Sequence, residues 1–228
     1  MDKKKNCPPM TIRGSTIKPT KMHKFLGVLV DEALCWHKHV NYAIGKGTAY
    51  MTQLRRLSNS TTGLPLKMMC QLYTVVTLPK MLYAIDIWCL PMYIGNDDTH
   101  QRGSIQVTKR LNSIQRIALL SITGALKLIA SDTLEAHAKL MPLPQCIQNL
   151  CHRAALCIAA TPPIHPLHPK FKCASKCFVL HHRSSLHHLA RTFRLTPDNI
   201  EMIHPACKPP EEVTPINIRI PTSKEKSI

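Results

Sequence analysis

Acidic residues are scarce in this chain of 228 residues. Thirteen Asp and Glu stand against thirty Lys and Arg, which gives a formal net charge of +17. So large a positive excess repels itself on a protein surface unless an anion lies nearby. The balance therefore favours a nucleic acid as the partner, and the alternative is a basic protein whose charge only aids solubility.

Long hydrophobic runs are absent as well. Pro79, Lys80 and Asp86 interrupt the most apolar stretch, residues 72–90, so no window reaches the roughly 18 apolar residues of a membrane span. The N-terminal sequence MDKKKNCPPM does not have the pattern of a secretory signal. We therefore expect an intracellular protein of the nucleus or cytoplasm with no membrane partner, and its ten cysteines to be reduced thiols.

An apolar fraction of 44% is sufficient for a core, and its periodicity predicts three regions. Residues 1–32 have strand character, with a turn at Arg13–Gly14–Ser15 and a second apolar run at 25–30, which predicts a β-hairpin or a pair of short strands. Residues 33–160 have a helical period and predict a bundle. Residues 161–228 are rich in Pro and His and predict a connector. The fold class is therefore mainly α, a helical bundle with a short N-terminal β-hairpin and an extended, partly disordered C-terminal connector.

The helices of the predicted bundle are bounded by Pro, Gly and capping residues. We expect one to begin near Pro65 and to kink or end at Pro79, another to end near Gly124, and a third to be capped by Asp132 with Glu135. A further helix should follow Pro142 and Pro144 and run to about residue 160. The first helix has an apolar stripe that consists of Trp36, Val40, Ile44, Gly47, Met51, Leu54 and Leu57.

The predicted connector has three parts of different composition. We expect the stretch TPPIHPLHP, residues 161–169, to be extended because of its prolines. A short helix is predicted between Ala174 and Phe193. Residues 205–228 are polar and interrupted by Pro, and we expect them to be mostly disordered.

An ordered set of segments resembles the reverse transcriptases of fungal non-LTR (LINE-type) retrotransposons. The segments are FLGVLVD (25–31), HKHV (37–40), LRRL (54–57), GL (63–64), LPKMLYAIDIW (78–88), IQRIALLSITGA (114–125), LEAHAKLMPLP (134–144) and HRAALCIAATPPIHPLH (152–168). The resemblance implies that the chain is the fragment that follows the catalytic aspartates: the end of the palm with the primer grip, the thumb, and the connector before RNase H.

The resemblance also implies which residues bind nucleic acid. Phe25, Leu26 and Gly27 match the primer grip, where a glycine lets a sugar-phosphate backbone approach closely. The basic helix that follows would be the thumb and would lie along an RNA/DNA template–primer duplex. Its phosphate contacts would then be Lys38, Lys46, Arg55 and Arg56, which position a duplex without reading its sequence.

The catalytic residues of that family have no match in this sequence. Family members carry an aromatic-Ala-Asp-Asp turn, because phosphoryl transfer by two metal ions needs paired carboxylates on rigid strands. The only Asp pair here is Asp97–Asp98 in YIGNDDTHQ, which we interpret as a surface loop or a helix cap. We therefore expect no catalytic residue, no cofactor and no small-molecule substrate in this chain, and assign Mg²⁺ to the parent polymerase.

Two other functions remain possible from the sequence. One is a small basic nucleic-acid- or protein-binding module derived from a mobile element. The other is a zinc-dependent structural module, in which Cys173, Cys177 and His181 would lie on one helical face. We favour scattered thiols and imidazoles over zinc, because structural zinc sites usually have two tight pairs of ligands. The cluster consists of His165, His168, Cys173, Cys177, His181 and His182.

Overall fold

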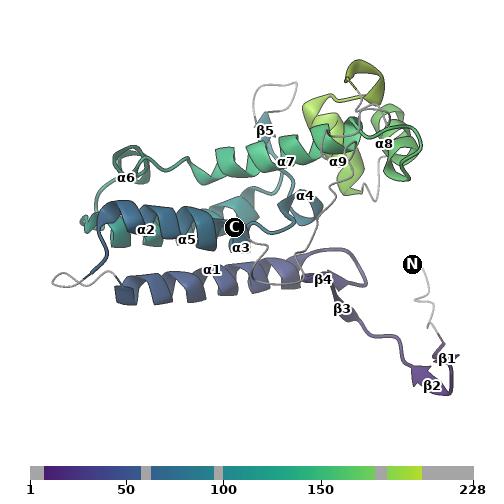
Figure 1. The fold of residues 1–228 in the computed structure, drawn as a ribbon, viewed down its shortest axis with the longest axis horizontal. Coiled ribbons are helices and arrows are strands. Elements are labelled where there is room, and N and C mark those ends of the chain that lie inside the picture. The colour runs from purple at the N-terminus through teal and green to yellow at the C-terminus, as the bar shows by residue number, and fades with distance from the viewer. Residues whose placement is uncertain (1–7, 58–62, 95–99, 178–183, 202–228) are drawn as a thin grey trace, which may run out of the picture. The chain divides into compact units, whose positions relative to one another are not determined.

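The computed structural model describes residues 8–57, 63–94, 100–177 and 184–201. The chain divides into two compact units, residues 1–154 and 155–228. Most of the described residues are helical, and short antiparallel strand pairs lie at the N-terminus, so the predicted fold class is confirmed (Figure 1). The domain boundaries at 32 and 160 stay a prediction.

The first unit begins with two β-hairpins. Strands β1 (Met10–Ile12) and β2 (Ser15–Ile17) form the first, and β3 (Met22–Phe25) and β4 (Val28–Asp31) form the second. Each has a two-residue turn in which both residues have positive φ: Arg13 and Gly14 at 50° and 78°, Leu26 and Gly27 at 46° and 87°. This is the type I′ geometry that matches the twist of the strands. The apolar run 25–30, expected as one strand, is therefore divided by a turn at Leu26–Gly27.

Seven α-helices lie wholly or partly in the described part of the first unit. They are α1 (His37–Leu57), α2 (Leu66–Leu72), α3 (Leu78–Met81), α4 (Ile85–Trp88), α5 (Ile105–Thr123), α6 (Ser131–Ala138) and α7 (Leu143–Ala159), which continues into the second unit. A short pair, β5 (Tyr93–Ile94) and β6 (Gln101–Arg102), precedes α5. Helix α5 packs against both α1 and α6, and in Figure 1 α1 and α5 lie side by side.

Helix α1 buries most of the predicted stripe. Val40, Gly47, Met51 and Leu54 are buried together with His39 and Ala43, and Ile44 is half-buried. The two ends of the stripe were predicted wrongly. Trp36 precedes the helix and has a positive φ of 62°, and Leu57 is exposed at its last residue.

The helix that begins after Pro65 continues past Pro79, where we expected a kink or an end. Between α2 and α3 the chain forms a π-helical turn, η1 (Tyr73–Thr77). Proline lacks an N–H and crowds the carbonyl four residues earlier in a regular α-helix. A wider π turn directly before Pro79 relieves this conflict, so the helix ends only at Met81.

The ends of α5 and α6 give one confirmed prediction and one correction. Gly124 ends α5 with a φ of 63°, as expected. Asp132 and Glu135 do not form a capping box, because α6 begins after Ala130 without a side-chain cap. Glu135 is instead buried, and its Oε1 accepts a hydrogen bond of 2.8 Å from Nε2 of the buried Gln115.

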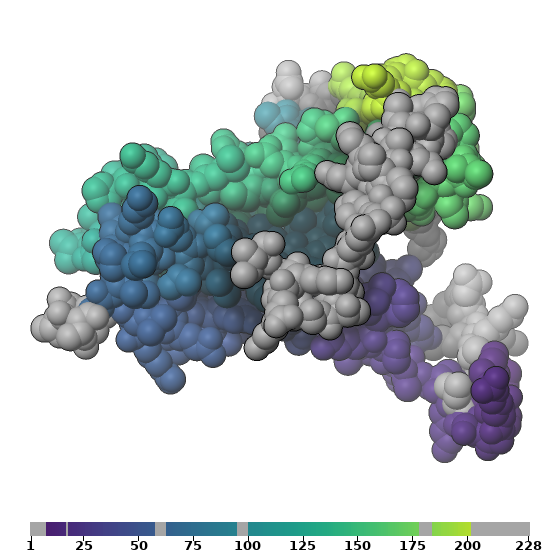
Figure 2. Space-filling view, viewed as in Figure 1, coloured from purple at the N-terminus to yellow at the C-terminus, as the bar shows by residue number. Residues whose placement is uncertain are grey.

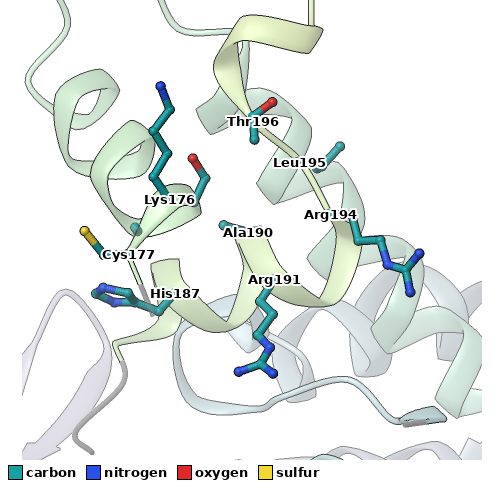
Figure 3. A pocket seen from close by; sticks show the side chains of 10 residues that line it. Lys176, Cys177, His187, Ala190, Arg191, Arg194, Leu195 and Thr196 are labelled. Atoms are coloured by element: carbon teal, nitrogen blue, oxygen red, sulfur yellow. The ribbon is translucent and has the colours of Figure 1, made fainter. Parts of the chain in front are cut away.

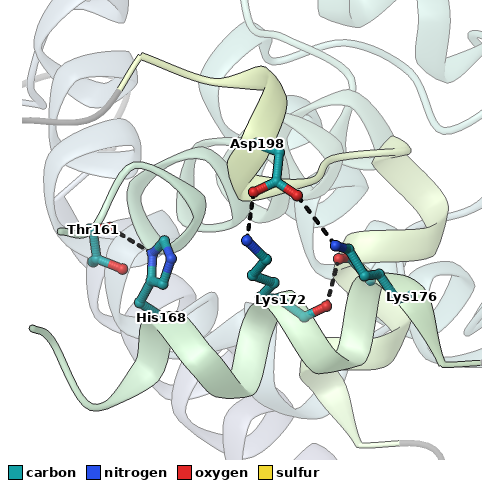
Figure 4. Close-up of polar contacts among 6 residues, drawn as sticks. Thr161, His168, Lys172, Lys176 and Asp198 are labelled. Atoms are coloured by element: carbon teal, nitrogen blue, oxygen red, sulfur yellow. Dashed lines mark hydrogen bonds and ion pairs between the residues drawn. The ribbon is translucent and has the colours of Figure 1, made fainter. Parts of the chain in front are cut away.

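The second unit contains α8 (Leu167–Lys176), α9 (Ser185–Phe193) and a 3₁₀ turn, η2 (Pro197–Asn199). We expected one helix between Ala174 and Phe193, and an extended stretch at 161–169. Helix α8 begins inside that stretch because Pro169 lies in its first turn, where a missing N–H is tolerated. His168 is buried, and its Nδ1 donates to the carbonyl oxygen of Thr161 at 2.8 Å (Figure 4).

Residues 205–228, which we expect to be disordered, lie outside the described part of the chain. Within the described ranges, none of the helices has both the length and the apolar character needed to cross a membrane.

Candidate nucleic-acid interface

The turn at Leu26–Gly27 forms an exposed apolar tip with a rigid support. The side chains of Phe25 and Leu26 are 63% and 76% exposed. The hydroxyl of Tyr83 donates a hydrogen bond of 3.0 Å to the carbonyl oxygen of Leu26. A Cβ at Gly27 would lie 3.3 Å from the ring of Tyr83, so the ring packs closely against the glycine. The tip is thus fixed to the segment between α3 and α4.

His39 connects the tip to α1. Its Nδ1 accepts a hydrogen bond of 3.1 Å from the backbone N–H of Leu29 in β4. Its ring lies edge-on to Trp88, with 5.1 Å between ring centroids. Burial lowers the pKa of His39, and the positive charge of Lys46 lowers it further. Both effects favour the neutral imidazole that this hydrogen bond requires.

Asp31 sets the point at which α1 begins. Its carboxylate accepts hydrogen bonds of 3.2 Å from the backbone N–H groups of Cys35 and Trp36. Desolvation acts to raise the pKa of Asp31, but the hydrogen bonds from Trp36 and Cys35 lower it overall. The ionised carboxylate therefore holds the tight turn between β4 and the first residue of α1.

The four predicted basic residues of α1 lie on three sides of the helix. At about 100° per residue, Lys38 and Arg56 lie in line opposite the buried stripe, about five turns or about 27 Å apart. Lys46 and Arg55 lie on opposite flanks, each about 80 to 100° from that line. Lys38, Arg55 and Arg56 are exposed and Lys46 is half-buried. One duplex lying along the outward line would thus meet Lys38 and Arg56 most directly.

Lys24 and Tyr42 belong to the same surface and were not predicted from the sequence. The Nζ atoms of Lys24 and Lys46 lie 5.5 and 4.6 Å from the centroid of the Tyr42 ring. Hydrogen bonds from Lys46 and then Lys24 lower the pKa of Tyr42. Tyr42 lies four residues before Lys46, a spacing that brings side chains together on a helix. The contact of Lys24 with Tyr42 depends instead on how the hairpin of β3 and β4 packs against α1.

The hairpin and α1 together form a continuous surface. In Figure 2 they appear as adjoining purple and dark blue atoms along the lower side of the view. The residues in line between Lys38 and Arg56 are small, namely the exposed Gly45 and Ala49. Asn41, Tyr42, Thr52 and Gln53 lie beside this line, about 40 to 60° away. A phosphate backbone could therefore approach this helix closely between the two cations.

The described part of the zinc candidate contains a pair of thiols. The Sγ atoms of Cys173 and Cys177 are 3.6 Å apart and both residues are exposed. The side chain of His165 is engaged locally, since its Nδ1 accepts from the N–H of Leu167 at 3.2 Å. No three His, Cys, Asp or Glu side chains are grouped for a metal ion among the described residues. His181, His182 and the pair Asp97–Asp98 lie outside those residues.

Two proteins of known type are similar to this chain. One is the RNA-directed DNA polymerase from the mobile element jockey of Drosophila funebris, 27% identical over 84 residues, or 37% of this chain and 9% of the relative. The other is the probable RNA-directed DNA polymerase from the transposon X-element of Drosophila melanogaster, 28% identical over 138 residues, or 60% of this chain and 14% of the relative. The matched region is thus a small part of each relative.

No protein-family model matches the chain, and no solved structure does. The two similarities support the resemblance to reverse transcriptases of LINE-type elements. The fungal origin and the position of the chain within such a polymerase stay predictions.

Proposed function

We propose that this chain is the part of a LINE-type RNA-directed DNA polymerase that follows the catalytic aspartates, and that it binds the template–primer duplex. The tip at Phe25–Leu26 would support the end of the primer. The outward face of α1 would lie along the duplex as the thumb. The observation that carries the proposal is the fixed placement of this exposed apolar tip, held by His39 and Tyr83, beside the line of Lys38 and Arg56.

The contacts of α1 would be made to phosphates. Lys38 and Arg56 carry their charges on the outward face, and Gly45 and Ala49, which lie in line between them, have no side chain that could read bases. Contacts to phosphates position a duplex but carry no sequence information. Binding should therefore depend on salt and be nearly independent of sequence.

Polymerisation itself is assigned to the parent protein. Two-metal catalysis requires paired carboxylates that hold Mg²⁺ at the primer end, and no aromatic-Ala-Asp-Asp segment occurs in this sequence. Lys38, Lys46, Arg55 and Arg56 supply only positive charge. The chain would therefore hold the substrates of a reaction that other residues catalyse.

Equilibrium binding to RNA–DNA duplexes tests the proposal. Two fluorescent duplexes of about 20 base pairs with unrelated sequences would be titrated with the protein at several salt concentrations. We expect dissociation constants that agree within about threefold, and that rise steeply between about 50 and 200 mM salt. A preference of more than about tenfold for one sequence, or binding insensitive to salt, would overturn the proposal.

A primer-extension assay tests the assignment of catalysis. With Mg²⁺, a primed template and nucleotides, the purified chain should not extend the primer. Extension that is lost in an Asp97→Ala variant would show that the pair Asp97–Asp98 is catalytic, and the assignment of polymerisation to the parent protein would then be wrong.

A further inference from the structure

A pair of thiols lies at the end of α8, in a part of the chain to which the proposed function gives no role. The Sγ atoms of Cys173 and Cys177 are 3.6 Å apart and in hydrogen-bond contact. Residues four apart on a helix lie on the same face, and both of these side chains are exposed. Free cysteine is usually a buried residue, so the packing of a core does not account for either thiol.

The other described cysteines differ from this pair. Cys89 and Cys151 lie next to each other, but both are buried. Burial raises the pKa of their thiols to about 11 and about 12. The deprotonated thiol is the form that reacts with oxidants, so these two are protected. Cys35 and Cys157 are exposed, but within the described ranges neither has a hydrogen bond to a second thiol.

Cys177 can be reached by small molecules in solution. It lines a pocket of about 400 Å³ together with Lys176 and His187, and in Figure 3 its sulfur atom points away from Ala190. The hydrogen bond with Cys173 raises the pKa of Cys177, so this residue keeps its proton at neutral pH and its S–H group faces the sulfur of Cys173. A small oxidant that reaches one sulfur therefore finds the other beside it.

The end of α8 allows these two sulfurs to form a bond. Residues four apart on a helix have Cβ atoms about 5 to 6 Å apart, whereas a disulfide needs about 3.5 to 4.5 Å, so the Cβ atoms must approach each other. Cys177 is the first residue after α8, and its ψ of 127° is extended. Its N–H still donates a hydrogen bond of 2.9 Å to the carbonyl oxygen of Cys173. A rotation at this terminal residue brings the sulfurs together without unwinding the helix before it.

The rest of α8 is anchored independently of the thiols. Phe171 and Ala174 are buried. The carboxylate of Asp198 in η2 lies 2.7 Å from Nζ of Lys172 and 3.3 Å from Nζ of Lys176 (Figure 4). A bond between Cys173 and Cys177 would therefore change the end of the helix and leave its packing in place.

We propose that Cys173 and Cys177 are a reversible redox pair that a hydroperoxide oxidises to a disulfide. One thiolate attacks the O–O bond, an S–O bond forms, and the second oxygen leaves with the electron pair and takes a proton. The other sulfur then attacks this sulfenic acid, the S–S bond forms, and water leaves. In sum, two thiols lose two electrons and two protons, and the hydroperoxide is reduced to an alcohol and water. The inference goes beyond the proposed function, because it uses none of the residues of the tip or of α1.

Peptide mapping of the oxidised chain tests the redox pair. Trypsin cleaves after Lys and Arg, so it separates Cys173 in CASK (173–176) from Cys177 in CFVLHHR (177–183). The full-length chain would be treated in dilute solution with hydrogen peroxide and a metal chelator, then alkylated and digested without a reductant. We expect the two peptides to be joined with the loss of two hydrogen atoms, and to separate after reduction with dithiothreitol.

Two variants show whether the placement of the thiols matters. Cys173→Ser leaves Cys177 without its partner, so its thiol should be oxidised further to the sulfinic acid. Cys173→Ser with Lys170→Cys keeps two exposed positions but places the thiols seven residues, or about 10 Å, apart along the chain. The yield of joined peptides should then fall at least about tenfold, because a sulfenic acid at one position does not meet the other sulfur.

Oxidation of the exposed Cys157 shows that enough oxidant has been added. The dose of hydrogen peroxide would be raised until this thiol is modified. Absence of the joined peptides from the wild-type chain at that dose would refute the redox pair. Equal yields from the wild type and from the variant with Lys170→Cys would do the same, because the bond would then not depend on the end of α8. Loss of duplex binding by α1 would leave the inference intact.

Discussion

The Nδ1 atom of His39 accepts a hydrogen bond of 3.1 Å from the backbone N–H of Leu29. A side chain of α1 thereby fixes the strand that follows the exposed tip. Only an imidazole without a proton on Nδ1 can accept this bond. The geometry of the proposed interface therefore depends on the protonation state of one buried histidine.

Stability should fall at mildly acidic pH because of His39. Its pKa is lowered in the folded chain from the ordinary value of 6.5, first by burial and then by Lys46. Between pH 6.5 and the lower folded pKa, His39 is therefore protonated more in the unfolded chain than in the folded chain. The contribution is fully present above pH 6.5 and is lost as the pH falls through the interval between 6.5 and the folded pKa.

An Asn at position 39 separates this effect from that of the other histidines. The amide oxygen of His39→Asn can accept the bond from Leu29 but does not titrate. We expect the free energy of unfolding, measured by denaturant titration at about pH 7.5 and about pH 5.5, to change less with pH in the variant than in the wild type. Identical changes in the two proteins would show that His39 has no role in the pH dependence.

Leu26→Asn should stabilise the hairpin and weaken duplex binding. Leu26 has a φ of 46°, a conformation that Asn tolerates better than Leu, and Asn-Gly is favoured in type I′ turns. The substitution also removes the exposed apolar side chain that would support the primer. The midpoint of thermal unfolding should rise while the dissociation constant for a primed duplex increases. Stronger or unchanged binding would contradict a role of Leu26 at the primer end.

Gly45 and Gly47 form a matched pair for the packing of α1. A Cβ at Gly47 would lie 2.9 Å from Sδ of Met81 and 3.1 Å from Cδ1 of Ile114, whereas nothing lies within 4 Å of one at Gly45. Gly45→Ala should stabilise the protein by up to about 1 kcal/mol through helix propensity. Gly47→Ala should be less stable than Gly45→Ala by about 1 to 3 kcal/mol, because the core is overpacked. Denaturant titration of both variants tests this, and equal stability would mean that the helices pack differently.

Most of the helices could be predicted from periodicity, because each has one buried face. The buried residues of α1 and the glycine that ends α5 follow directly from that pattern. The errors occurred where tertiary contacts override it. Glu135 has the spacing of a capping residue, but the buried amide of Gln115 needs an acceptor in the core. A π turn before Pro79 likewise cannot be recognised from a proline alone.

The candidate interface could be predicted in part. The tip and the basic residues of α1 were named from the resemblance, and helix geometry then shows that Lys38 and Arg56 share a line while Arg55 does not. Lys24 was missed because its relation to Tyr42 depends on the docking of the hairpin.

Charge reversal on α1, measured through the salt dependence of duplex binding, tests the central claim most directly. Lys38→Glu with Arg56→Glu would be compared with Lys224→Glu with Lys226→Glu, which makes the same change in net charge near the C-terminus. If Lys38 and Arg56 contact phosphates, the first variant should bind more weakly. The slope of its plot of log association constant against log salt concentration should be smaller in magnitude by about two. The second variant should keep the slope of the wild type. Equal losses of duplex affinity in the two variants would contradict an interface on the outward face of α1 and would show that binding depends on net charge alone.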